Sequence, residues 1–406
     1  MILVDQVEAL TDDAPTRILA RTLSESLVSA LQQFDGLAIS RKPRESTEAV
    51  ARLLKQNADR SVYQLASELR IDHDTVHLWW HLSDLRTTEV YWTATQEGPW
   101  KENATSAEAE IAQKVATAVA YRNGLVKSLE ARTIPDPPPP GYLCVLRVQR
   151  YVLLMDPKNH AVARDCLERT VALSPYYADA WAYLAIIYND EVRNRYNPDH
   201  SLDAVLAKAK DAASKAQQLA PYSAMAYKAL MVVDFTQNDY RGFEDAFRRA
   251  IEISPADPEV LVYGGNRLWS IGRFEEGVAL VRKALAINTN PGPLEALTLA
   301  LDEYRLGHYQ QTIALLRLMP ADSLYLVPML YAATYGQLGD RDAARPHIAR
   351  LLEVHPNFAH EFRDDFHERH IVDSYADAVA DGLRKAGLGI VEPTPRVDTA
   401  AKPNQR

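Results

Sequence analysis

A periodic arrangement of turn residues in the C-terminal half constrains the fold of this chain more than any other feature. Pro221 and Pro255 are 34 residues apart, and Asn238, Gly272 and Gly307 follow one another at intervals of 34 and 35 residues. The segments around these turns, QNDYRGF, IGRFEEGV and LGHYQQTI, share the order of a turn followed by the start of a helix. A period of this length predicts a stack of helix pairs in which each pair packs against its neighbours.

The residues between these turns resemble the tetratricopeptide repeat. Trp181, Leu184 and Tyr188 follow Pro175 at the spacing of the first helix of that repeat. Small residues such as Ala185 let paired helices approach, and a proline after the second helix ends it. The resemblance implies an α-helical solenoid of about six repeats, near 144–177, 178–223, 224–257, 258–292, 293–324 and 325–358. The second repeat carries an insertion, NRYNPDHS; an unrelated helical bundle with coincidentally spaced prolines is the alternative.

In tetratricopeptide proteins the first helices line a concave groove, which predicts where this chain would hold a protein partner. The candidate partner-binding residues on those helices are Asn189, Lys228, Phe235, Asn266, Trp269 and Tyr304. Phe235 and Trp269 are the candidate anchors, because exposed aromatic rings often carry binding energy. The alternative is that both rings pack between repeats. The sequence shows no basic cluster suited to clamping a peptide carboxylate.

The N-terminal part lacks the repeat period and instead alternates strand and helix patterns, which predicts a small α/β sandwich-like domain. We expect a strand at 2–7, a helix from about 14 to 34 and a strand at 37–40. Ser61 and Gln64 form a capping-box pattern that predicts a short helix through Leu69. Strands at 71–83 and 88–95 and a helix from Thr105 to Val119 complete the order β-α-β-α-β-β-α. The whole chain is therefore expected to be α/β plus all-α.

Several stretches of this part resemble the TolB amino-terminal-like domain. They are LARTLSESLVSALQQFDGLAISRK, YQLASELRID and HLSDLRTTEVYWTA, and GLRKAGLGI resembles the last helix of the repeat array that follows such domains. The resemblance covers about 1–390 and implies a role in bacterial signalling, where this combination accompanies class III nucleotide cyclases or winged-helix regulators. The first strand lacks the expected Pro-Phe pattern, and 42–59 is looser than in the family. Neither a cyclase nor a winged-helix domain is present, so no output activity is carried over.

These patterns predict four segments. The TolB-like domain spans 1–124, a Pro-rich linker 125–141, the solenoid with its terminal helix 142–390, and a disordered tail 391–406.

Charge and hydropathy exclude several classes of partner. The net charge is −9, with acidic and basic residues interspersed, which argues against general binding to nucleic acid or anionic membranes. The most apolar stretch, YLCVLRVQRYVLLM, is interrupted by Arg147 and Arg150 and cannot cross a membrane. Cys144 and Cys166 are predicted to be free or buried thiols in a reducing cytosol. We expect a cytoplasmic protein, or a periplasmic one if a membrane segment precedes this sequence.

Possible metal and catalytic motifs are weak. His73, His77 and His81 would share one face of a strand, but neighbours on that face are ~7 Å apart, too far for one zinc ion. His367 and His370 in HERH are one residue short of the H-E-x-x-H spacing. Glycine-rich nucleotide loops and nucleophile elbows are also missing from the sequence. We therefore expect no catalytic residue, no metal and no cofactor.

The sequence therefore predicts a non-catalytic interaction or regulatory module whose repeat groove recruits a protein partner, with a homo-oligomer as a further possibility. One alternative is the sensory half of a nucleotide cyclase or transcription regulator whose effector lies upstream or in a separate chain. The other is an enzyme with an unrecognised site.

Overall fold

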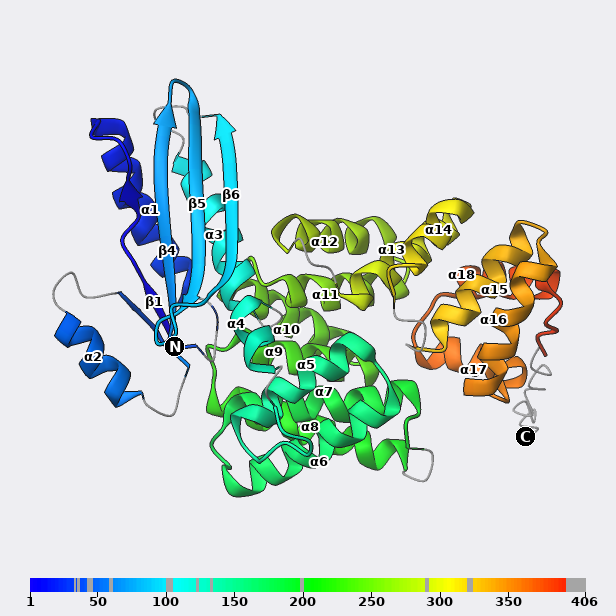
Figure 1. The fold of residues 1–406 in the computed structure, drawn as a ribbon. Coiled ribbons are helices and arrows are strands. Elements are labelled where there is room, and N and C mark those ends of the chain that lie inside the picture. The colour runs from blue at the N-terminus through cyan, green and yellow to red at the C-terminus, as the bar shows by residue number, and fades with distance from the viewer. Residues whose placement is uncertain are drawn as a thin grey trace, which may run out of the picture.

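The chain folds into a mixed sheet with two covering helices, followed by a long array of helices (Figure 1). The computed structural model describes residues 1–32, 34, 37–41, 47–57, 61–99, 105–121, 124–131, 134–197, 201–288, 292–319 and 324–391. The predicted class, α/β followed by an all-α solenoid, is confirmed. The predicted disordered tail lies outside the described residues, apart from Val391.

The sheet has both parallel and antiparallel strands. Its strands are β1 (Ile2–Val4), β2 (Glu8–Ala9), β3 (Ile39–Arg41), β4 (Tyr63–Asp72), β5 (Thr75–Asp84) and β6 (Val90–Pro99). They lie in the order β3-β1-β4-β5-β6, and β2 pairs with β4. The strand β1 is parallel to β3 and β4, whereas β4, β5 and β6 form an antiparallel meander.

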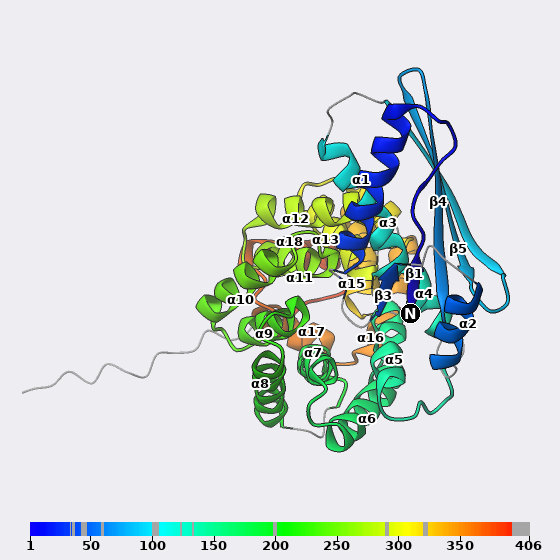
Figure 2. The ribbon, with the colours of Figure 1, turned by 90° about the vertical axis from the view of Figure 1, so that its left-hand side faces the viewer.

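Two helices, α1 (Ala14–Leu31) and α3 (Thr105–Ala120), pack against each other on one face of the sheet (Figure 2). The helix α1 begins where Asp13 accepts a hydrogen bond from the Thr16 amide at 2.8 Å. Leu23 and Leu27 on α1 and Leu65 on β4 are fully buried in the core between helices and sheet. Burial of one sheet face explains the alternation of buried and partly exposed residues along β4 and β5.

The predicted helix at 61–69 is wrong, because these residues form β4. Tyr63, Leu65 and Leu69 are buried in alternation with partly exposed residues, and this period of two prevails over the local capping-box signal. The predicted strand 71–83 is also wrong as one element, since a turn at 73–74 separates β4 from β5. The helix of this region is instead α2 (Thr47–Gln56), which lies within 42–59, the stretch that matches the TolB-like family only loosely.

The second part consists of consecutive helices packed in pairs from α5/α6 to α15/α16. The helices are α4 (Leu125–Ala131), α5 (Tyr142–Leu154), α6 (Pro157–Leu173), α7 (Ala178–Asn194), α8 (Leu202–Leu219), α9 (Ala224–Thr236), α10 (Tyr240–Ile253), α11 (Pro258–Ser270), α12 (Phe274–Ile287), α13 (Pro293–Arg305), α14 (Tyr309–Leu316), α15 (Leu326–Gln337), α16 (Arg341–Val354), α17 (Phe358–Glu368) and α18 (Asp373–Ala386). Asn238, Gly272 and Gly307 turn between paired helices with φ of 63°, 89° and 78°. This left-handed backbone explains the glycine and asparagine recurrence in the sequence.

The segment that joins the two parts is more structured than a Pro-rich spacer. Residues 125–131 form α4, which contacts both α3 and α5. Just before α5, the Gly141 amide donates to Thr170 Oγ1 at 2.9 Å, and Arg147 pairs with Asp136 at 3.6 Å. These contacts fasten the end of the segment to the first helix pair.

The prediction of free thiols is wrong, because Cys144 on α5 and Cys166 on α6 form a disulfide. Their Cα atoms are 5.5 Å apart, and both side chains are fully buried. The pairing of α5 with α6 brings the two cysteines together, although 22 residues separate them in sequence. Among the described residues, none of the helices is both long enough and apolar enough to cross a membrane.

Candidate functional site

The first helices of successive pairs contact one another and form an inner layer of the solenoid. Contacts run from α5 to α7, α7 to α9, α9 to α11, α11 to α13 and α13 to α15. The C-terminal segment, which we define as α17, the turn 369–372 and α18, contacts the ends of α7, α9 and α11. The first helices therefore form one layer, as predicted, and the chain's own C-terminal segment covers part of it.

The six residues predicted to bind a partner are all buried. They are Asn189, Lys228, Phe235, Asn266, Trp269 and Tyr304. Lys228 forms an ion pair with Glu259 on the next first helix, and Asn266 donates to Thr298 Oγ1 at 3.0 Å. Partner binding by these residues stays a prediction, and it would require some of them to become exposed.

The two predicted anchor rings are covered by the C-terminal segment. The ring of His370 meets Phe235 edge-on with centroids 4.9 Å apart, and Tyr375 meets Trp269 at 4.8 Å. The Trp269 indole N–H also donates to Asp302 at 3.0 Å. These contacts make both rings part of the core under α17 and α18, as the packing alternative anticipated.

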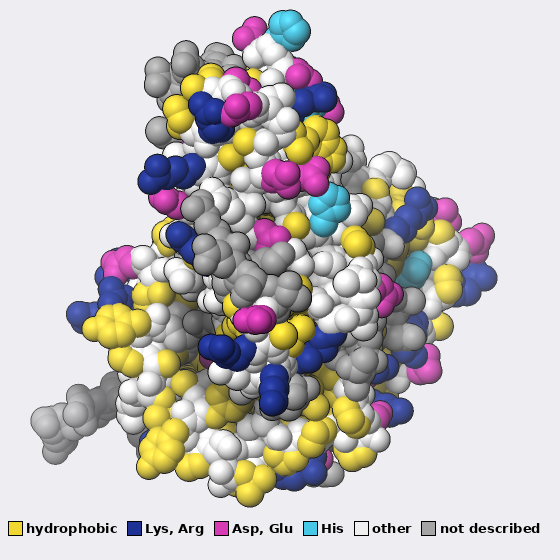
Figure 3. Space-filling view, turned by 60° about the vertical axis from the view of Figure 1, so that its left-hand side comes forward, with side chains coloured by type: hydrophobic (Ala, Val, Ile, Leu, Met, Phe, Trp, Pro, Cys, Tyr) yellow, Lys and Arg dark blue, Asp and Glu magenta, His cyan; other side chains and the backbone are white. Residues whose placement is uncertain are grey.

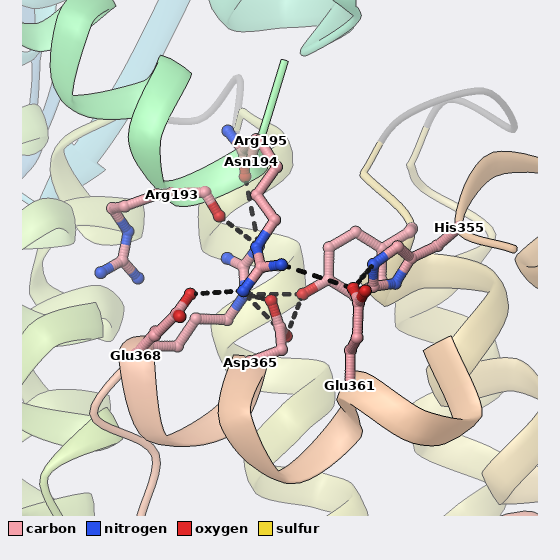
Figure 4. A network of polar contacts seen from close by, with 9 residues as sticks. Arg193, Asn194, Arg195, His355, Glu361, Asp365 and Glu368 are labelled. Atoms are coloured by element: carbon pink, nitrogen blue, oxygen red, sulfur yellow. Dashed lines mark hydrogen bonds and ion pairs between the residues drawn. The ribbon is translucent and has the colours of Figure 1, made fainter. Parts of the chain in front are cut away.

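A network of ion pairs joins the end of α7 to α17 (Figure 4). Arg195, which ends α7, pairs with Glu361 at 3.4 Å and with Glu368 at 2.8 Å, both on α17. His355 reaches the same Glu361 carboxylate at 3.0 Å. Burial opposes the charge of Arg195, but its hydrogen bond with Glu368 and the surrounding carboxylates outweigh this effect and raise its pKa.

A second connection runs through Arg369, which is buried at the end of α17. Its Nε donates to the Tyr325 hydroxyl at 2.7 Å and to Asp365 at 3.2 Å. Its Nη2 donates to the backbone carbonyl of Arg193 at 2.7 Å, and the Tyr325 hydroxyl also bonds Asp365. Burial opposes the charge, but Tyr325 and Asp365 raise the pKa of Arg369 above its ordinary value. One side chain thus links α7, α15 and α17.

Arg193, Arg267 and Arg369 also converge on a cavity of about 60 Å³ between the inner layer and the C-terminal segment. Arg267 is only 4% exposed and lies over the rings of Phe235 and Tyr263 at 5.6 and 6.0 Å. Its Nη1 donates to the Asn266 side-chain oxygen at 2.7 Å, and its Nε has no hydrogen-bond partner among the described residues. Burial lowers its pKa.

One acidic residue faces these arginines at the cavity, Asp190. Its carboxylate accepts a hydrogen bond from the buried Tyr151 hydroxyl at 3.1 Å, and burial raises its pKa. Arginines that are far apart in sequence thus meet at one small cavity, although the sequence showed only an arginine near the end of α7 and another near the end of α11. The prediction that no basic cluster is suited to clamping a peptide carboxylate stays a prediction.

The histidine motifs do not assemble as the sequence suggested. His73 lies in the turn before β5 with φ of 53°, so it does not share the strand of His77 and His81. His77 pairs with Glu97 on β6 at 3.1 Å. His367 is in the last turn of α17, whereas His370 follows that helix. No group of three or more histidine, cysteine or acidic residues in the described chain is placed to hold a metal ion.

Comparison with known proteins gives likenesses in structure only. No protein-family model and no curated protein sequence matches the chain. The Pseudomonas aeruginosa PilF structure is 18% identical over 57% of this chain and 95% of its own, with a TM-score of 0.36. The Cut9–Hcn1 hetero-tetramer of the APC/C is 13% identical over 68% of this chain and 48% of its own, with a TM-score of 0.43. A tetratricopeptide repeat protein from Parabacteroides merdae is 14% identical over 60% of this chain and 97% of its own, with a TM-score of 0.33. At these values no ligand or partner is transferred to this chain.

Proposed function

We propose that this chain is a non-catalytic protein-interaction module whose inner layer of first helices recruits a segment of a partner protein. The observation that carries the proposal is that this layer already holds a helix-turn segment through side chains. Arg195, Phe235 and Trp269 hold it by charge pairing and ring contacts. Such mixed polar and aromatic contacts are typical of protein interfaces.

The sheet domain serves in this proposal as a docking or sensing unit, in line with its resemblance to TolB amino-terminal-like domains in bacterial regulators. The alternative is a sensory half whose cyclase or transcription-regulating effector lies upstream or in a separate chain. Basic and acidic side chains are interspersed on the face in Figure 3, which supports a protein partner rather than nucleic acid.

The disulfide bears on where the protein works. Buried disulfides such as Cys144–Cys166 persist in oxidising compartments and are rare in the cytosol. We therefore propose the periplasm in place of the cytoplasm that the sequence suggested.

Site-specific photo-crosslinking tests the proposed function. A photoreactive residue replaces Asn194, beside the inner network, in the full chain, and a second version carries it at Arg248 on the second helix α10. A discrete partner crosslinked in native cells from position 194 and not from position 248 supports the proposal. Equal crosslinking from both positions contradicts it.

A further inference from the structure

The helix α17 has two faces that contact different parts of the solenoid. Phe358, Phe362 and Phe366 recur every four residues and are buried in the core with the last helix pairs. Glu361 and Glu368 project from another side toward Arg195 at the end of α7 (Figure 4). A helix with this division is suited to join two surfaces, one apolar and one charged.

The acidic face of α17 has a regular spacing. Glu361 and Glu368 lie at positions i and i+7, so that they share one side of the helix, and the buried Asp365 lies between them. Figure 4 shows the Glu361 and Glu368 side chains directed toward Arg195 at the end of α7, whereas Asp365 pairs with Arg369 at the end of its own helix. Each of the two glutamates makes an ion pair with Arg195.

The end of α7 depends on this acidic face for its charge pairing. In the part of the chain that the structure describes, both carboxylate partners of Arg195 come from α17. Asp190, one turn earlier on α7, bonds Tyr151 instead, and Arg193 Nη1 is buried without a hydrogen-bond partner. The surface left if α17 moved away would carry unpaired guanidinium groups, and this surface has the charge to bind carboxylates.

The turn after α17 continues along the inner layer. His370 covers Phe235 and lies 3.3 Å from the Tyr240 hydroxyl, and the Val372 amide donates to the Ser270 carbonyl at 3.1 Å. The segment 358–372 thus meets the ends of α7, α9 and α11 in succession, as a bound peptide would cross a row of first helices.

The hold on this segment is uneven. The side chains of Arg195, Glu361 and Glu368 are 32%, 34% and 51% exposed, and ion pairs with this exposure are weak. The phenylalanines on the opposite face are fully buried. The acidic face is therefore the part that a competitor can displace.

We propose that residues 358–372 are an internal ligand that occupies the inner layer, and that the external partner presents a helix with carboxylates at the i, i+7 spacing of Glu361 and Glu368 that competes for Arg195. This proposal rests on the proposed function and specifies the partner and the regulation of the same site. The chain then binds its partner only when the acidic face of α17 is released.

Charge reversal in the full chain tests the proposal. Glu361→Lys with Glu368→Lys places two cations against Arg195 and releases the acidic face. The probe is a labelled peptide of residues 357–372, and in a second peptide two of its four acidic residues, Glu361 and Glu368, are changed to the matching amides. We expect the acidic peptide to bind the variant at least tenfold more tightly than the wild type, and the amide peptide to bind neither.

The matched control is Glu244→Lys with Glu276→Lys. Arg273 holds these two exposed carboxylates on α10 and α12 as Arg195 holds Glu361 and Glu368, and the change in net charge is the same. The control should bind the peptide as the wild type does. Adding Arg195→Glu to the Glu361→Lys, Glu368→Lys variant restores the ion pairs with opposite signs, and it should abolish the tighter binding of the acidic peptide.

Hydrogen exchange supplies a second measurement that does not depend on the peptide. Exchange in 358–372 should be faster in the reversed variant than in the wild type or the control. Unchanged exchange, equal peptide binding by all proteins, or equal binding of the two peptides overturns the proposal.

Crosslinking from position 194 distinguishes the proposed recruitment of a partner from self-occupation, by which we mean occupation of the inner layer by residues 358–372. Equal partner capture by wild type and reversed variant leaves the proposed function standing and overturns self-occupation. Faster exchange and tighter peptide binding without any partner capture support self-occupation and remove the proposed function.

Discussion

Replacing Arg369 with methionine should destabilise the solenoid strongly. The substitution keeps much of the aliphatic stem but removes the hydrogen bonds to Tyr325, Asp365 and the Arg193 carbonyl. Asp365 would remain buried without its cation. Breaking a buried ion pair from one side costs about 3–5 kcal/mol, because the remaining charge has lost both water and partner.

The measurement is urea unfolding followed by far-ultraviolet circular dichroism, which reports mainly on the helices. The control on the same helix is Arg363→Met, whose partner Asp377 is 65% exposed, and it should lose only about 0–1 kcal/mol. Adding Asp365→Leu to Arg369→Met should recover much of the stability, because the unpaired charge is then gone. A loss below about 1 kcal/mol for Arg369→Met would refute the reasoning that this side chain fastens α17 to α7 and α15.

Four further outcomes follow from the packing. Replacing Cys144 and Cys166 with alanine should cost roughly 3 kcal/mol in thermal unfolding, as expected for a bridge spanning 22 residues, and reductant should then have no further effect. Trp269→Ala should lower the free energy of unfolding by about 3–5 kcal/mol, because the ring is fully buried in the core. If the variant instead loses partner capture at unchanged stability, Trp269 is a surface anchor. The pKa of His370 is lowered to about 4, first by burial and then by nearby arginines. Its neutral form therefore stabilises the fold above pH ~6.5, and this stability is lost as the pH falls toward 4. Hydrogen exchange in 358–372 should become faster over this pH window, and the increase should be smaller in His370→Asn. Gly336→Ala should destabilise the packing of α15 on α18 by about 1–3 kcal/mol in urea unfolding, because its Cβ would collide with the backbone oxygen of Gly382 on α18.

The helix-pair architecture could be predicted because its determinants are local. Asn238, Gly272 and Gly307 adopt left-handed backbone at the turns, a conformation that most side chains disfavour, so their recurrence marked each helix pair directly. An aspartate before the first turn of a helix is a local signal of the same kind, because its side chain caps the helix start, as Asp13 does before α1.

The strand β4 shows where local signals fail. Ser61 and Gln64 match a helix start, yet Leu65 and Leu69 become buried only because β5 and α1 supply the sheet and its cover. Strand pairing depends on partners that are distant in sequence, so a short capping pattern could not decide the outcome.

The sequence by itself determined the repeat period, the turns and the division into a sheet domain and a helical array, because backbone restrictions at glycine, asparagine and proline act over a few residues. Only the tertiary structure decided that Phe235 lies beneath His370, and that Arg193, Arg267 and Arg369 share one cavity. Residues from 193 to 369 meet there because the C-terminal segment folds back over the inner layer. That return is a long-range packing event, in which the buried faces of α17 and α18 pack against residues of distant helices, and no periodicity in the sequence encodes its direction.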